Sequence, residues 1–191
     1  MPTDLKMLAL IVLILVVAAA LLVLVFRRRS PGTAAQLRNV SKDYMTHFLI
    51  PDGQGGEIHI ENALLCSRGI VIVDIKDFEG NIFGGDTMQD WTVIAGNKRF
   101  TFANPLPGLL DRTAAMAHLL PDVPISGYVA FTSRGKFAKG VPSKVIGLET
   151  LIRELGEEAK RTSEAMNSWW PSWEKLRDEA VVAQLAKLVD A

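Results

Sequence analysis

Three charged residues stand inside two apolar, β-branched stretches, where ionised groups are costly to bury. Glu61 lies within residues 57–65, and Asp74 and Lys76 lie within residues 70–76. A carboxylate or ammonium group in a sheet core needs an opposite charge, hydrogen bonds or a metal ion around it. The residue types and their spacing therefore indicate either a paired ionic cluster or a metal-binding site.

The two stretches predict the strands of one β-hairpin, because both show strand-like patterning and a turn signal lies between them. A two-residue loop at Ser67 and Arg68 would place Cys66 opposite Gly69. A three-residue loop with Gly69 as a bulge would instead shift the register by one residue. We expect the shorter loop, with the longer one as the alternative.

With the two-residue loop, Glu61 lies opposite Asp74 and His59 lies opposite Lys76, all on one face. Carboxylates on facing positions are about 5 Å apart and repel each other, and a divalent cation between them removes the repulsion. Oxygen ligands of this kind suit magnesium or manganese, which also bind water and phosphate oxygens. The pair Glu61 and Asp74 is therefore the predicted metal site.

Lys76 would assist at this site by polarising an attacking water or by neutralising charge that develops on a phosphate. This is the chemistry of phosphodiester hydrolysis. The alternative is an ordinary ion-pair network of Glu61, Asp74 and Lys76 at the end of a sheet. His59, a lone histidine in a strand, is more simply a hydrogen-bonded structural residue.

Several motifs around these residues occur in an order that is characteristic of one family. They are LIPDG at 49–53, SRGIVIVDIKDFEGNIFGG at 67–85, Trp91, NPL at 104–106 and YVAF at 128–131. On these motifs the chain resembles the nuclease-related domain (NERD) family, a branch of the PD-(D/E)xK restriction-endonuclease-like superfamily. The resemblance implies a mixed sheet flanked by helices, and a site where Glu61, Asp74 and Lys76 act on nucleic acid with magnesium.

The chain departs from the family's usual pattern at three places. Glu61-Asn62 stands where the family usually has aspartate followed by histidine, and Thr33 follows Gly32 where the family has Gly-Glu. After NPL, Pro107-Gly108 occupies the stretch in which the family usually has a glutamine. The alternative function is therefore a catalytically inactive NERD-like domain that binds nucleic acid or a protein.

Residues 7–26 contain no charged side chain and are followed by three arginines at 27–29. Twenty helical residues span the roughly 30 Å hydrocarbon layer of a bilayer. This segment is predicted to be a transmembrane helix, in preference to a cleavable signal peptide. The arginines predict that the N-terminus faces outward and the globular part lies in the cytoplasm, at a bacterial-type inner (plasma) membrane.

The predicted organisation is a short tail at 1–6, the transmembrane helix at 7–26, a basic linker at 27–32, a nuclease-related domain at 33–147 and a helical extension at 148–191. The fold class is α/β. The formal net charge is zero, which argues against strong non-specific binding to nucleic acid. The single cysteine, Cys66, lies in an apolar strand and is expected to be a buried, reduced thiol.

Two helices are predicted on either side of the hairpin, at 33–44 and at 106–120. The first is expected to carry Tyr44 on its apolar side. The second is expected to face the sheet with Leu109, Leu110, Ala114, Ala117 and Leu120.

Two stretches, 77–90 and 133–144, are predicted to be irregular, because both are rich in glycine and charged residues. In the second, Arg134, Lys136 and Lys139 are candidate contacts to the phosphate backbone of DNA or RNA. The alternative for these cations is a solvated surface loop.

Trp169, Trp170 and Trp173 cluster at the start of the last predicted helix, 171–189. We expect them to close the core, because nearby acidic residues would be repelled by an anionic lipid surface. The alternative is that these tryptophans form a contact surface at the bilayer or for a protein partner.

Overall fold

The computed structural model of the chain describes residues 32–160 and 163–189. Its contacts divide the chain into residues 1–35 and residues 36–191, and the second unit is the subject below. The predicted transmembrane segment at 7–26 lies outside the described residues. Within the described residues, no helix is both long and apolar enough to cross a bilayer.

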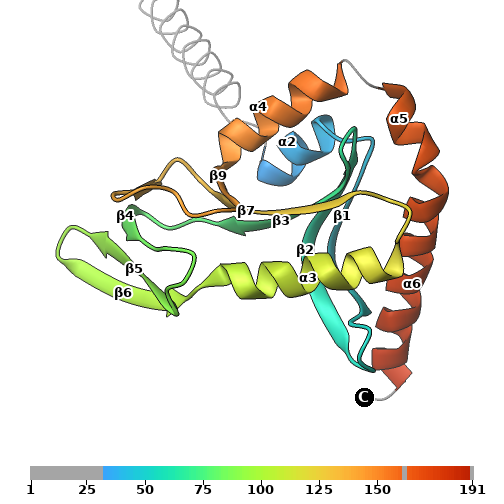
Figure 1. Cartoon of the computed structure of the whole chain (residues 1–191), viewed down its shortest axis with the longest axis horizontal. Coiled ribbons are helices and arrows are strands. Elements are labelled where there is room, and N and C mark those ends of the chain that lie inside the picture. Colours follow the sequence, from blue (N-terminus) through green and yellow to red (C-terminus); the bar gives the residue numbers. More distant parts are fainter. Residues whose placement is uncertain (1–31, 161–162, 190–191) are drawn as a thin grey trace, which may run out of the picture. The chain divides into compact units, whose positions relative to one another are not determined.

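In chain order, the described helices and strands are α2 (Thr33–Asn39), β1 (Asp43–Pro51), β2 (Glu57–Cys66), β3 (Gly69–Lys76), β4 (Gly80–Phe83), β5 (Asp90–Ala95), β6 (Lys98–Ala103), α3 (Pro105–Leu119), β7 (Ile125–Phe131), β8 (Gly135–Phe137), β9 (Val145–Gly147), α4 (Leu148–Ala159), α5 (Ser163–Ser168) and α6 (Trp170–Val189). The described strands come in two groups, β1 to β6 and β7 to β9, separated by helix α3 and followed by helices α4 to α6 (Figure 1).

The described strands form two sheets, of order β1-β2-β3-β7-β9 and β6-β5-β4-β8. The first is mixed, because β1, β2 and β3 are antiparallel neighbours while β3, β7 and β9 are parallel. Helix α3 covers one face of the first sheet, and α2 and α4 lie on the other face (Figure 1). The chain is therefore a mixed α/β protein with sheets flanked by helices.

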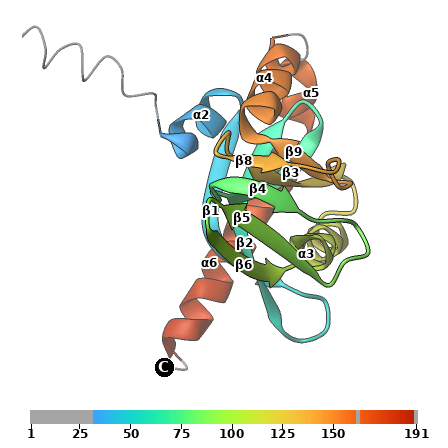
Figure 2. The same cartoon turned by 90° about the vertical axis from the view of Figure 1, so that its left-hand side faces the viewer.

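The second sheet continues the first. Strands β3 and β7 pair in parallel, and β4 and β8 pair in parallel with the same sequence offset, Ile70 with Ile125 and Gly80 with Gly135. Between the two pairs, Thr132 N donates a hydrogen bond to Lys76 O at 3.1 Å. Figure 2 shows the second sheet facing the viewer, with its β5–β6 hairpin on the outside. The C-terminal end of β3, which carries Lys76, thus lies where one sheet passes into the other.

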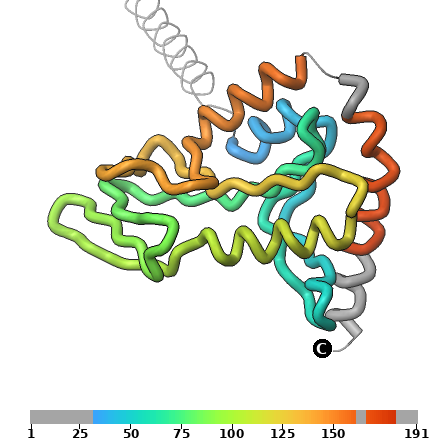
Figure 3. Tube along the Cα trace, in the orientation of Figure 1, coloured from blue at the N-terminus to red at the C-terminus, as the bar shows by residue number. Residues whose placement is uncertain are grey.

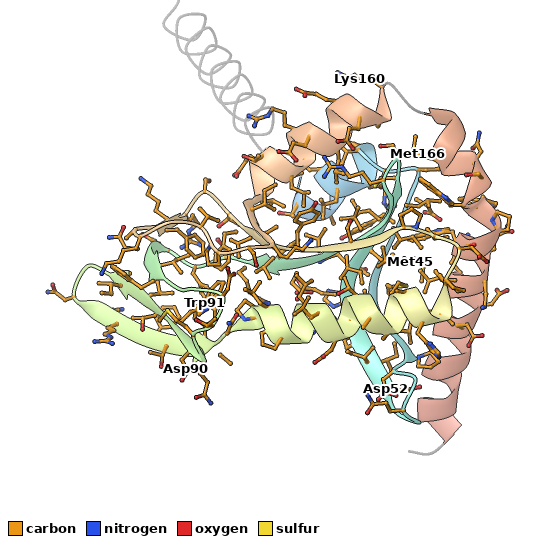
Figure 4. All side chains as sticks on the ribbon, in the orientation of Figure 1. Met45, Asp52, Asp90, Trp91, Lys160 and Met166 are labelled. Atoms are coloured by element: carbon orange, nitrogen blue, oxygen red, sulfur yellow. The ribbon has the colours of Figure 1, made fainter. Side chains whose placement is uncertain are left out.

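Two clusters of buried side chains fill the two sides of the first sheet. The larger cluster joins β1, β2, β3, α3, the second sheet and α6, and the smaller one joins the opposite face to α2 and α4. Trp91 belongs to the larger cluster, stacked on Phe131 with 6.3 Å between ring centroids, on the side of the second sheet that faces β7 (Figure 4).

The first predicted helix is shorter than expected. Helix α2 ends at Asn39, and Tyr44 belongs to strand β1, so the prediction of a helix through Tyr44 was wrong. Lys42 N donates to Leu65 O at 2.8 Å, and pairing with β2 continues from there. Pairing with a distant strand therefore overrides the helical spacing of the apolar residues.

Two predicted irregular stretches contain short strands. Strand β4 lies within 77–90 and β8 within 133–144, and each pairs with segments distant in sequence. Local composition does not report such pairings, because the partner strands supply the hydrogen bonds. The trace in Figure 3 shows β8 returning alongside β4.

The tryptophan cluster closes the core, as predicted. Trp173 is fully buried and its Nε1 donates to Asp43 Oδ2 of β1 at 2.8 Å. Trp169 and Trp170 are partly buried against the larger cluster. Lys42 Nζ lies 4.7 Å from the Trp170 ring centroid.

Candidate active site

The turn between β2 and β3 sets the position of every charged residue further along the two strands. Cys66 pairs with Gly69, which confirms the two-residue loop, and the pairing of β2 with β3 continues to Ala63 opposite Ile72. Gly69 has φ +103°, and a Cβ atom there would lie 2.1 Å from Pro124 O. Only glycine fits this position without a backbone shift, so the register is fixed at the turn.

Beyond Ala63, side chains replace the backbone hydrogen bonds between the two strands. Asn62 Nδ2 donates to Val73 O at 2.9 Å, and Ile75 N donates to Glu61 Oε1 at 3.2 Å. The Glu61 carboxylate therefore lies at the backbone between Asp74 and Lys76. Glu61 therefore lies beside Asp74 and Lys76, as expected, but its hydrogen bond to β3 is with the backbone amide of Ile75.

Asn62 orients Glu61 from below. It is 4% exposed, its Nδ2 also donates to Glu61 Oε1 at 3.3 Å, and Tyr44 Oη donates to its Oδ1. Burial and, to a lesser extent, the nearby Glu61 charge raise the pKa of Tyr44, so this phenol keeps its proton. The amide that follows the first acid thus has a defined role, which sequence reasoning missed.

Lys76 completes the contact with the first acid. Its Nζ lies 3.8 Å from Glu61 Oε2, and both side chains keep slightly more than a quarter of their surface accessible. Asp74 and Lys76 lie two residues apart on β3 and so point to the same face. The three residues predicted from the sequence are therefore grouped where β2 and β3 diverge.

Asp74 has a partner that sequence reasoning did not identify. Asp74 is only 2% exposed, and its Oδ2 accepts a hydrogen bond from Arg112 of α3, with which it forms an ion pair. Arg112 Nε is buried and has no hydrogen-bond partner among the described residues. Each carboxylate of the site thus has its own cation, Lys76 for Glu61 and Arg112 for Asp74.

The rotation of α3 brings Arg112 to this place. Leu109 and Met116 are buried, and Arg112 follows Leu109 by three residues and precedes Met116 by four, on the same helical face. The predicted face was partly wrong, because Leu110 is 59% exposed and Ala114 and Ala117 are exposed too. An arginine at a helical spacing between buried apolar residues was the signal that could have found it.

The start of α3 is fixed by Asn104, the first residue of the NPL motif. Asn104 Oδ1 accepts from Leu106 N at 2.9 Å, which caps the helix, and Pro105 follows at a favourable first position. Asn104 Nδ2 donates to Met88 O at 2.8 Å and so joins the helix start to the loop after β4. The motif therefore holds the helix that carries Arg112.

His59 lies apart from the charged group. It pairs with Leu49 of β1, and its ring stacks on His47 with 5.5 Å between centroids. Within the described residues, no hydrogen bond or ion pair joins His59 to Lys76. His59 is exposed, and among the described residues its side chain makes no hydrogen bond, so neither the expected place opposite Lys76 nor the expected hydrogen-bonded role is observed.

The three cations of the basic stretch differ in their surroundings. Arg134 donates to Asp77 Oδ2 at 2.9 Å and to Glu79 Oε2 at 2.7 Å, so its charge is balanced within the chain. These contacts raise the pKa of Arg134, through Glu79 most of all. Lys136 on β8 and Lys139 after it are exposed.

The donor set at the site is small. In the described part of the chain, no group of three or more His, Cys, Asp or Glu side chains is placed to hold a metal ion. Glu61 and Asp74 offer two carboxylates, and magnesium commonly takes only one or two from a protein while water fills its other positions. Two carboxylates are thus donors of the kind that magnesium and manganese use.

Comparison with known proteins identifies one family. A family model described as "Nuclease-related domain" matches residues 32–132. No curated protein and no solved structure matches the chain. The matched segment is more than half of the 191 residues and includes Glu61, Asp74, Lys76 and Arg112. The chain therefore belongs to the nuclease-related domain (NERD) family.

Proposed function

We propose that this protein is a metal-dependent nuclease that hydrolyses phosphodiester bonds in DNA or RNA. Glu61 and Asp74 hold magnesium or manganese, and Lys76 assists the reaction. The observation that supports this most directly is the Ile75 N–H bond to Glu61 Oε1 at 3.2 Å. It holds the first acid at the backbone between the second acid and the lysine.

Each residue has a distinct task in this proposal. The Ile75 amide and Asn62 orient the Glu61 carboxylate, which leaves Oε2 directed toward Lys76. The Lys76 ammonium group neutralises charge on a phosphate oxygen or orients the attacking water. A bound divalent cation would supply Lewis acidity and lower the pKa of a bound water.

The proposed setting is the membrane. Residues 7–26 would anchor the chain with the N-terminus outside, and the arginines at 27–29 would keep the nuclease-related domain in the cytoplasm. DNA or RNA would reach the site from that side, and a protein partner is not identified.

A second candidate function is nucleic-acid binding without hydrolysis. The pairing of Asp74 with Arg112 favours it, because this carboxylate already has a cation. The exposed Lys136 and Lys139 would contact phosphates in either case, while Arg134 would have to leave Asp77 and Glu79 first.

The test is a cleavage assay with the full-length protein in detergent, DNA and RNA substrates, and magnesium or manganese. We expect Lys76→Ala and Glu61→Gln to reduce cleavage by about 100-fold or more, since each removes a charged group from the reacting centre. Lys160→Ala, at an exposed lysine directly after α4, is the matched control and should cleave like the wild type.

Equal products from the wild type and Lys76→Ala, or no products at all, would contradict the nuclease. Saturable, salt-sensitive binding without products would support the second candidate instead, because phosphate contacts release counterions. Charge reversal at Lys136 and Lys139 should then weaken the binding.

A further inference from the structure

The carboxylate proposed as a metal ligand is already paired with a cation from another element. Asp74 is almost fully buried, and Arg112 of α3 reaches its Oδ2. We propose that Arg112 competes with the divalent cation for Asp74, so that metal binding requires the guanidinium to move away. This inference rests on the metal-binding part of the proposed function.

Gly108 provides the space in which the guanidinium lies. A Cβ atom at position 108 would be 3.3 Å from Arg112 Nη1 and 3.4 Å from Nη2. Gly108 precedes Arg112 by one turn of α3, so the guanidinium lies along the helix beside the bare glycine. A methyl group at position 108 would therefore press on the guanidinium, which would have to shift by a few tenths of an ångström.

The contact between Arg112 and Asp74 leaves part of the guanidinium unused. Only Nη2 contacts the carboxylate, and the buried Nε has no acceptor among the described residues. A bidentate arginine–carboxylate pair would use two parallel N–H groups and hold more strongly. A single contact is easier for a doubly charged ion to replace.

A guanidinium and a divalent cation beside the same buried carboxylate repel each other strongly, because the surroundings screen charge less than water does. The two interactions are therefore linked. Arg112 lowers the affinity of the site for the metal ion, and the bound metal ion weakens the contact of Arg112 with Asp74 by the same factor. Released from Asp74, the guanidinium has free donors of the kind that bind phosphate oxygens.

The experiment is calorimetric titration of the full-length protein in detergent with Mn²⁺ alone. Arg112→Met removes the competing charge and should tighten the dissociation constant at least about tenfold. Gly108→Ala keeps every charge but places a methyl group against the guanidinium, and should tighten it by a smaller factor. Arg153→Met, at an exposed arginine of α4, removes the same charge elsewhere and should change nothing.

Adding Asp74→Asn to Arg112→Met identifies the site, since the double variant should lose the tight Mn²⁺ binding of Arg112→Met. An unchanged or weaker constant in Arg112→Met, or no Mn²⁺ binding in any variant, would overturn the competition. Should Arg112→Met fail to fold, Arg112→Gln, which also removes the charge, decides, and an unchanged constant there would overturn the competition.

The outcomes separate this inference from the nuclease. Tighter Mn²⁺ binding by Arg112→Met without cleavage of DNA or RNA would leave the competition standing and defeat only the nuclease. Cleavage by the wild type together with an unchanged constant in both variants would defeat only the competition.

Discussion

Two arginines hold the two ends of the β2–β3 hairpin in different ways. At the turn, Arg68 bonds Glu158 of α4 through Nε at 2.6 Å and contacts Glu154 at 3.4 Å. All three side chains are between about a quarter and two fifths exposed. At the open end, Arg112 contacts a single carboxylate, Asp74, whose side chain is 3% exposed.

This difference distinguishes an ion pair with a structural role, at Arg68, from one whose carboxylate belongs to the proposed metal site, at Arg112. Arg68 donates to two carboxylates and to the Tyr128 hydroxyl, all of them partly exposed, so water and the remaining acceptors can compensate for one lost contact. The hydrogen bond to Glu158 is the main cause of the raised pKa of Arg68. Among the described residues Arg112 is the one cation paired with Asp74, whose side chain is almost inaccessible to solvent. The backbone ladder is also complete at the turn and replaced by side chains at the open end.

The largest expected effect comes from breaking the buried pair. Arg112→Met leaves the Asp74 carboxylate buried without its cation and should lower the free energy of unfolding by about 3–5 kcal/mol. Urea denaturation measures this. Asp74→Asn combined with Arg112→Met should recover most of the loss, whereas a loss below about 1 kcal/mol in the single variant would show that the pair is solvated.

A smaller loss of stability is expected from replacing Asn62, whose side-chain amide bridges β2 and β3 where their backbone pairing has ended. Asn62→Ala leaves Val73 O and the Tyr44 hydroxyl without their partner and should cost about 2 kcal/mol of unfolding free energy. Asn97→Ala, in the exposed β5–β6 turn, is the control and should be close to neutral. Equal effects of the two substitutions would refute the bridging role of Asn62.

The smallest effect is expected at the turn. Arg68→Gln should lower the free energy of unfolding by no more than about 1 kcal/mol, because its partners are partly exposed. The loss should shrink further in high salt, where exposed charges are screened. A loss as large as that of Arg112→Met would remove the distinction between the two arginines.

The sequence was informative where local chemistry decides the structure. Ser67, Arg68 and Gly69 predicted the hairpin and its loop length, and Cys66 is buried as expected. The alternation of the strands also placed Asp74 and Lys76 on one face. These features depend on turn geometry and side-chain period, which a single sequence carries.

The sequence was uninformative where distant segments decide. The rotation of α3 depends on which of several apolar residues the sheet accepts. Leu110, expected to face the sheet, is exposed, and Arg112 lies on the side of α3 that faces Asp74. Strands β4 and β8 pair with each other beyond the ends of β3 and β7, at the same sequence offset. The partner of the second acid therefore follows from the packing of α3, which the apolar residues alone left open.

Both hydrophobic clusters include residues that lie beyond the family-matched segment. Trp173 and Leu176 of α6, and Leu151 and Leu155 of α4, are fully buried in them, yet all four follow the family-matched segment that ends at 132. Cutting the chain there would uncover both faces of the first sheet at once. Shortened versions are therefore expected to aggregate, and single substitutions in the intact polypeptide are the sound route to assigning its activity.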